Sequence, residues 1–150
     1  MPLKKIVKKL LGELLIERQI ITPEQLEQAI LIQKQKGGLI GEILVENGFA
    51  KEEDIAQTLT AQYGFPYLPL ENYEIDTEII KLIPHELANR YVVVPVDKLG
   101  NSLSISMSNP LDSEAIEKVE AHTGSKIQIF VSTSSDIRRA INKYYKKADK

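Results

Sequence analysis

The sequence has 150 residues, of which 43% are apolar and 27% are charged, and these fractions are typical of a folded globular protein rather than a disordered or fibrous chain. The 19 basic and 21 acidic side chains give a net charge of −2, which argues against general affinity for nucleic acid. The sequence has no cysteine, which excludes disulfide scaffolds and cysteine chemistry, and no apolar run approaches the roughly 20 residues of a membrane span, so we expect a soluble intracellular protein.

The first 15 residues combine four lysines with an apolar stripe at helical spacing. The stripe consists of Leu3, Ile6, Val7, Leu10, Leu11, Leu14 and Leu15, and the lysines lie opposite it. This pattern predicts an amphipathic helix. We favour a helix that buries the stripe in a core and leaves the lysines in water. The alternative is a helix that lies on an anionic membrane surface through residues 1–11.

The strongest internal signal is a duplication with a period of 29 residues. Residues 10–33 align without a gap with residues 39–62, and the five-residue spacer 34–38 separates the two 24-residue units. The identical positions include Leu10/Leu39, Gly12/Gly41, Glu13/Glu42, Leu15/Leu44, Glu17/Glu46, Gln28/Gln57 and Gln33/Gln62. Each unit predicts a helix, a turn and a second helix, so the first half is expected to form a lobe of four helices.

Local capping signals support this interpretation. Thr22, Pro23 and Gln25 form the outline of a capping box at the start of a helix. Asn47-Gly48 predicts a left-handed stop before the next helix, which opens at Lys51–Asp54. Gln19 occupies the position of Gly48 in the first unit, so that turn either closes differently or places a non-glycine residue in the left-handed region.

Gly12 and Gly41 are an informative pair, because a glycine inside a helix costs about 1 kcal/mol relative to alanine and here it occurs twice at one offset. One explanation is a helix crossing in which the main chains approach closely. The other is a ligand that lies on exposed peptide groups, with Leu15 and Leu44 as an apolar floor. Gln33 and Gln62 end the two units, either as surface residues or as amide clamps on such a ligand.

The second half predicts a small α/β lobe. Residues 64–72 form a linker after the first lobe (residues 1–63), and residues 73–145 continue with a short helix over 77–83 and a helical turn over 86–90. Strands are predicted at 91–97, 103–108 and 126–131, with helices at 112–122 and 135–145, followed by a basic tail at 146–150. The order is ββαβα with a parallel crossover, so we expect an α+β fold in which the four-helix lobe precedes a small mixed sheet.

No catalytic pattern is found in the sequence. His85 and His122 are the only histidines, and neither stands near a matching carboxylate or serine pattern. Neither Gly37–Gly41 nor Gly124-Ser125-Lys126 has the spacing of a Walker loop. Ser132–Ser135 lies between a strand and a helix and is interpreted as an N-cap cluster. We therefore expect neither catalytic residues nor a metal site, and hence no enzyme activity in this chain.

The two units resemble the paired 24-residue motif of the N-terminal domain found on type II secretion and type IV pilus assembly ATPases. The resemblance continues through Tyr63–Pro66, Leu82–Pro84, the Gly100-Asn101 hairpin, Met107–Asp112 and the final helix at 141–145. It implies a docking and regulatory domain, appended to an ATPase domain, that contacts an inner-membrane platform protein from the cytoplasm.

Some members of this family bind cyclic di-GMP through the two motifs. Carried over by position, the candidate ligand-binding residues are Leu11, Gly12, Leu15 and Gln33 in the first unit and Ile40, Gly41, Leu44, Gly48 and Gln62 in the second. This sequence departs from the motif at Leu10 and Leu39, where the ligand-binding pattern has arginine. The leading hypothesis is therefore a non-catalytic docking domain whose nucleotide binding is weakened or lost, and the alternative is a cyclic di-GMP sensor.

Overall fold

The computed structural model describes residues 11–148, with side chains up to Tyr145. Residues 11–17 are helical, and the remainder of the predicted N-terminal helix, including Leu10, lies outside the described residues. Of the predicted basic tail, the backbone of residues 146–148 continues the last helix, and residues 149–150 lie outside the described residues.

The first half forms the predicted pair of helix-turn-helix units. After the helical residues 11–17 come α2 (Pro23–Lys36), α3 (Ile40–Glu46) and α4 (Glu52–Tyr63). The capping box at the start of α2 is confirmed: the Gln25 amide donates to Thr22 Oγ1 at 3.1 Å, and the Thr22 amide donates to Gln25 Oε1 at 2.9 Å. These two bonds fix where α2 begins.

The turns inside the two units have the same geometry. Gln19 has φ 62° and Gly48 has φ 74°, so both are left-handed. The Ile20 amide donates to Leu15 O at 2.9 Å, and the Phe49 amide donates to Leu44 O at 2.9 Å. The duplication is therefore structural as well as sequential, and the first unit closes with a strained glutamine where the second uses glycine.

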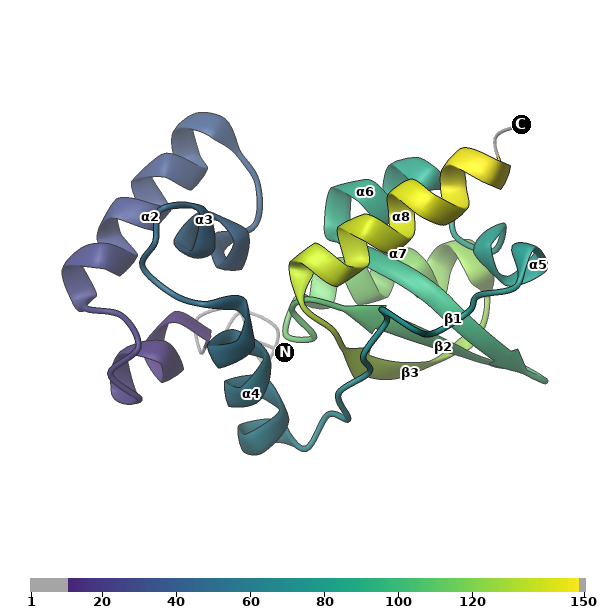
Figure 1. The fold of residues 1–150 in the computed structure, drawn as a ribbon, viewed down its shortest axis with the longest axis horizontal. Coiled ribbons are helices and arrows are strands. Elements are labelled where there is room, and N and C mark those ends of the chain that lie inside the picture. Colours follow the sequence, from purple (N-terminus) through teal and green to yellow (C-terminus); the bar gives the residue numbers. More distant parts are fainter. Residues whose placement is uncertain (1–10, 149–150) are drawn as a thin grey trace.

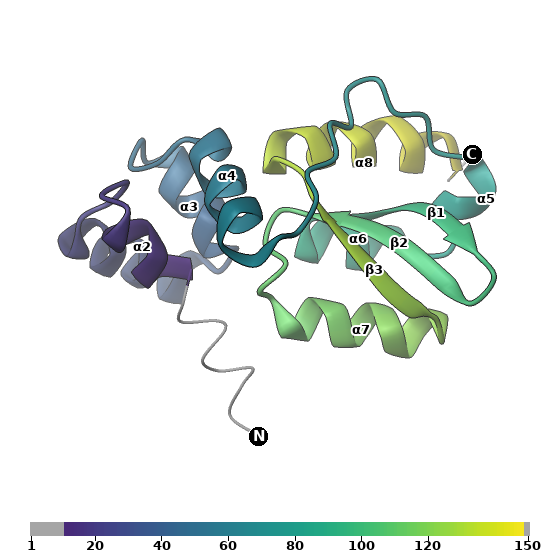
Figure 2. The ribbon, with the colours of Figure 1, turned by 90° about the horizontal axis from the view of Figure 1, so that it is seen from below.

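The second half is the predicted small α/β lobe. It contains α5 (Thr77–Ile80), α6 (His85–Tyr91), β1 (Val93–Leu99), β2 (Ser102–Met107), α7 (Ser113–Thr123), β3 (Lys126–Val131) and α8 (Ser134–Ala148). The sheet order is β1-β2-β3, with β1 antiparallel and β3 parallel to β2. Helices α7 and α8 lie on opposite faces of this sheet (Figure 2). The expected α+β class and ββαβα order are confirmed.

Several boundaries differ from the sequence prediction by one to three residues, and two of these differences have a clear local cause. The helix predicted over 77–83 stops at Ile80, and its last residues form a turn before Pro84. The first strand begins at Val93 rather than at Tyr91, because Tyr91 is the last residue of α6 and Val92 ends that helix with a left-handed φ of 53°. The apolar run at 91–94 therefore includes a helix end as well as a strand.

Each half has its own hydrophobic core, and the two halves lie side by side (Figure 1). Residues of each half pack into the core of the other at the junction. Leu111 and Val131 of the second half pack into the helical core, and Leu39 of the first half packs against the α/β core. The predicted linker is held against the sheet, because the Leu68 amide donates to Val131 O at 2.8 Å and the Val131 amide donates to Pro66 O at 2.9 Å. No helix among the described residues is long and apolar enough to cross a membrane.

Candidate functional site

An open groove of about 770 Å³ runs between the two lobes. The helical lobe contributes Gly12, Glu13, Leu26, Ile30, Gln33, Gly38, Leu39 and Ile40, and the α/β lobe contributes Arg90, Tyr91, Asn109, Asp112 and Glu114. We call this the interlobe groove. Its volume lies within the roughly 300–1,000 Å³ range of ligand clefts. Three of the candidate residues from the sequence, Gly12, Gln33 and Ile40, meet here.

The Gln33 side chain is already engaged at the edge of this groove. Its Nε2 donates to Gly38 O at 3.0 Å, and its backbone carbonyl accepts from the Gly37 amide at 2.7 Å. Gln33 therefore fastens the end of α2 to the spacer between the units. A ligand that used this amide as a clamp would have to replace the bond to Gly38.

The two motif glycines have different surroundings. A Cβ at Gly12 would lie 2.9 Å from both terminal methyls of Leu26 on α2, which is closer than real Cβ contacts. A Cβ at Gly41 would meet its nearest neighbour, Ile55 Cδ1, at 4.0 Å, which is ordinary contact. The absence of a side chain at Gly12 thus lets the first helix pack closely against α2 within the first unit. The group of α2 that comes close is the Leu26 side chain rather than the main chain. Packing does not demand a glycine at position 41.

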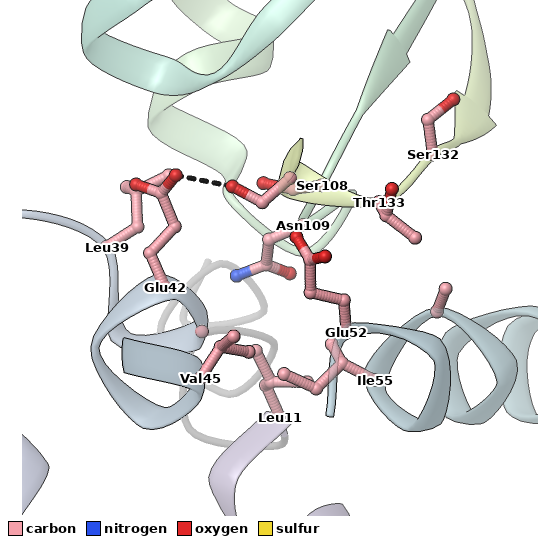
Figure 3. Close-up of a pocket in the computed structure, with 13 residues that line it drawn as sticks. Leu11, Leu39, Glu42, Val45, Glu52, Ile55, Ser108, Asn109, Ser132 and Thr133 are labelled. Carbon is pink, nitrogen blue, oxygen red and sulfur yellow. Dashed lines mark hydrogen bonds between the residues drawn. The ribbon is translucent and has the colours of Figure 1, made fainter. Parts of the chain in front are cut away.

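Gly41 lines a second, narrow pocket of about 30 Å³ beneath the α/β lobe (Figure 3). Its walls include Leu11, Glu52, Asn109 and Thr133. A volume of this size holds one or two water molecules, since each requires about 10–15 Å³ on this measure. This narrow pocket by itself is therefore far too small for a dinucleotide.

The remaining candidates lie elsewhere. The Leu15 and Leu44 side chains are fully buried in the helical core. Gly48 lies exposed in the turn between α3 and α4, and Gln62 lies exposed in the last turn of α4. The nine candidate positions therefore divide between the interlobe groove, the narrow pocket, the core and the outer surface.

Sequence reasoning missed a clasp of polar side chains that joins the lobes. Glu42 accepts from Arg138 Nη2 at 2.8 Å and from Arg138 Nε at 3.0 Å, and the Ser134 hydroxyl also donates to it. Glu52 accepts from the Ser135 amide at 2.7 Å and from its hydroxyl at 2.8 Å. Figure 3 shows Glu42 and Glu52 extending from the helical lobe on either side of Asn109. We call Glu42, Glu52, Ser134, Ser135 and Arg138 the interlobe clasp.

The clasp places two carboxylates at the N-terminal end of α8, where the helix dipole favours negative charge. Burial raises the pKa of Glu42, but the hydrogen bonds from Arg138 and Ser134 and the guanidinium charge outweigh it and leave the pKa lowered. The hydrogen bond to Glu42 in turn raises the pKa of Arg138 against the opposing effect of burial. Arg138 Nη1 also donates to Asn89 O at 3.0 Å, which orients the guanidinium.

The charged side chains of the interlobe groove are predominantly acidic. Glu13, Asp112 and Glu114 carry carboxylates, and Arg90 is the single cation among the described residues that line it. Glu114 accepts from the Tyr91 hydroxyl at 2.6 Å, and this bond, together with burial, raises the pKa of Tyr91. Because Arg90, Asp112 and Glu114 come from the second half of the chain, the duplicated motif in the first half does not predict their place in the groove.

Comparison with known proteins places the chain in a family. The family model of the MshEN domain matches residues 63–150, which is more than half of the chain, and the protein therefore belongs to the MshEN domain family. The type IV pilus assembly ATPase PilB of Myxococcus xanthus is 37% identical over 135 residues, which span 90% of this chain and 24% of that protein.

Two solved structures extend the comparison. A structure of MshE with cdg, that is, cyclic di-GMP, is 29% identical with a TM-score of 0.67, and the match covers 90% of this chain and 98% of that one. The N-terminal domain of XpsE shares the fold, with a TM-score of 0.75 at 21% identity over 92% of this chain and 95% of that one. The chain thus shares the fold of the XpsE N-terminal domain and spans about a quarter of the PilB relative.

Proposed function

We propose that this protein is a non-catalytic docking and regulatory domain of a type IV pilus or type II secretion ATPase. In this role it binds a cytoplasmic part of the inner-membrane platform protein and so attaches the motor's ATPase domain to the membrane. It acts at the cytoplasmic face of the inner membrane through that partner. The proposal draws on the match to PilB and on the likeness to the XpsE N-terminal domain.

The observation that carries the choice of docking over nucleotide sensing is the small number of cations among the described residues of the interlobe groove. Arg90 supplies one guanidinium there, whereas a cyclic dinucleotide brings two phosphates. In addition, the motif position that holds arginine in ligand-binding members is Leu39 here, and its side chain packs against the α/β core. If each lost charged contact contributes roughly 1.5–3 kcal/mol, losing both arginines weakens binding by about 3–6 kcal/mol.

Cyclic di-GMP sensing is the second candidate function, and the MshE structure with cdg favours it. Gly12, Gln33 and Ile40 meet in the interlobe groove, as paired motif residues in a ligand site should. Under this alternative the dinucleotide would control the motor. Calorimetric titration with cyclic di-GMP separates the two functions, because stoichiometric binding at low-micromolar or tighter affinity is expected of a sensor only.

The docking function is tested with the cytoplasmic domain of the platform protein from the same system. Immobilised on a biosensor surface, that domain should capture the full 150-residue chain. The cytoplasmic domain of an unrelated membrane protein serves as the control. Absence of capture over the accessible concentration range would contradict the docking function directly.

A further inference from the structure

We propose that α2 carries a self-association surface, on which a second copy of this chain seats its own α2 in antiparallel orientation. The surface consists of Glu27, Ile30, Leu31 and Lys34, and we call it the α2 face. This inference goes beyond the docking function and does not rest on it.

The α2 face is a stripe along one side of the helix that remains open to water. Its four residues have the i, i+3, i+4, i+7 spacing of neighbours on a helix surface. Ile30 is 37% exposed and also borders the interlobe groove, and Leu31 is 58% exposed. Glu27 and Lys34 are exposed as well. In both views α2 lies at the opposite end of the molecule from α5, where another molecule can approach it (Figure 1 and Figure 2).

The duplication shows that the equivalent side of α4 is an interface. Ile30 aligns with Leu59, and Glu27 aligns with Ala56. Leu59 is fully buried and Ala56 is buried, both in the core into which Val131 of β3 packs. Helix α4 accordingly lies against β3. In the first unit the same side of the second helix carries aliphatic side chains that remain exposed, as an interface without its partner does.

The charges of the α2 face fit a second copy of the same face. If two α2 helices pair antiparallel about the point between Ile30 and Leu31, each Ile30 meets the other chain's Leu31 and each Glu27 meets the other chain's Lys34. The arrangement is self-complementary, as a two-fold interface requires. Glu27 and Lys34 are seven residues apart, so the two ion pairs lie about 10.5 Å from each other along the helix, on either side of the aliphatic centre.

Pairing within α2 does not compete with this arrangement. The positions three and four residues from Glu27 and from Lys34 carry no opposite charge. Neither side chain forms an ion pair with another described residue. A parallel arrangement would set Glu27 against Glu27 and Lys34 against Lys34, and like charges across an interface disfavour it. The charge pattern therefore selects the antiparallel pair.

The proposed pair is weak, because four aliphatic side chains and two exposed ion pairs make a small interface. We expect a dissociation constant on the order of 100 µM. An assembly that holds several copies of the chain close together raises their effective concentration and so favours the pair.

The first test is sedimentation equilibrium of the full 150-residue chain between about 10 µM and 1 mM. The protein should show a reversible equilibrium between monomer and dimer. Leu31→Glu places a charge at the centre of the pair and should weaken the dimer at least about tenfold. Because Leu31 is exposed, the variant should keep its fold, which circular dichroism checks.

The second test exchanges the charges. Glu27→Lys sets like charges against each other at both ends of the pair, and so does Lys34→Glu, so each variant alone should dimerise roughly tenfold more weakly. When the two variants are mixed, both contacts again join opposite charges. The mixture should therefore associate within about threefold of the wild-type affinity.

Matched controls come from α7. Glu120→Lys and Lys118→Glu make the same changes in net charge at exposed positions outside the α2 face. Each control variant should dimerise within about twofold of the wild-type protein. Their mixture should gain no affinity over the single control variants.

The outcomes discriminate. The inference is overturned by a chain that stays monomeric up to about 1 mM, by a dimer that Leu31→Glu leaves intact, or by a mixture of the two α2 variants that fails to associate. Equal effects of the α7 and α2 charge variants would also overturn it, since net charge alone would then govern association. Capture of the platform domain is a separate measurement, so failure of the docking function would leave this result unchanged.

Discussion

Glu42 and Arg138 are 96 residues apart in the sequence and form a two-bond ion pair that joins α3 to α8, with N–O distances of 2.8 and 3.0 Å. The Arg138 side chain is 38% exposed and that of Glu42 is 18% exposed, so the pair is partly screened by water. Glu42 immediately follows Gly41, the motif glycine of the second unit. The clasp therefore holds the second unit against the α/β lobe directly beside Gly41, one of the candidate ligand-binding residues.

The first prediction is that Glu42 and Arg138 are energetically coupled. For a half-buried, two-bond pair we expect a coupling free energy of about 1–2 kcal/mol, above the range of exposed pairs and below that of fully buried ones. A double-mutant cycle with Glu42→Ala, Arg138→Ala and the double variant, each unfolded in urea, measures it. Additive effects of the two single substitutions would show that the ion pair does not stabilise the lobe contact.

The second prediction concerns pH. Because the folded-state pKa of Glu42 lies below its unfolded value, the unfolded chain binds the proton more readily, and the stabilisation by this group is complete above the unfolded pKa. It is lost as the pH falls from about 4.3 through the lower folded pKa. The difference in urea midpoint between the wild-type protein and Glu42→Gln should therefore narrow as the pH falls through this range. A constant difference would contradict the lowered pKa.

The third prediction contrasts the two motif glycines. Gly12→Ala forces a Cβ against Leu26 and should lower the free energy of unfolding by about 1–3 kcal/mol. Gly41→Ala has room for its Cβ and gains helix propensity, so it should raise stability by up to about 1 kcal/mol. Thermal unfolding of the two variants checks the sign of each change, and equal destabilisation would mean that both glycines serve close packing.

The fourth prediction exploits the equivalent turns. Gln19→Gly relieves a left-handed non-glycine residue and should stabilise by about 0.5–1 kcal/mol, since the relief exceeds the added entropy of the unfolded chain. Gly48→Gln makes the converse change and should destabilise by about 1–2 kcal/mol. Chemical denaturation of this reciprocal pair gives both values. A loss of stability in Gln19→Gly would show that the glutamine side chain makes a compensating contribution.

Local patterns predicted much of the fold. The capping box at Thr22 and the third strand at 126–131 are where the sequence places them, and the helix predicted at 112–122 forms one residue later, at Ser113–Thr123. These features depend on hydrogen bonds and periodicities within a few residues, which a single sequence displays directly. The predicted start of the first strand at Tyr91 was wrong because the left-handed Val92 has no local signal: valine rarely adopts that conformation.

The site depends on contacts between distant segments, and this is why the sequence predicts less of it. The duplicated motif identifies Gly12 and Gly41 as a pair, but Gly12 packs closely against Leu26 of α2, whereas Gly41 lines the narrow pocket and has room for a Cβ. Glu42 repeats Glu13, yet Glu42 binds Arg138 whereas Glu13 lines the groove. Residues that are identical in the two units therefore predict the helices of the lobe, but the role of each copy depends on its tertiary neighbours.

The central claim, docking rather than nucleotide sensing, is tested most directly by calorimetric titration of the full chain with cyclic di-GMP at physiological salt. With leucine at both motif arginine positions and a single guanidinium among the described residues of the groove, the account predicts no binding at low-micromolar concentrations. Tight binding with one ligand per chain would contradict it.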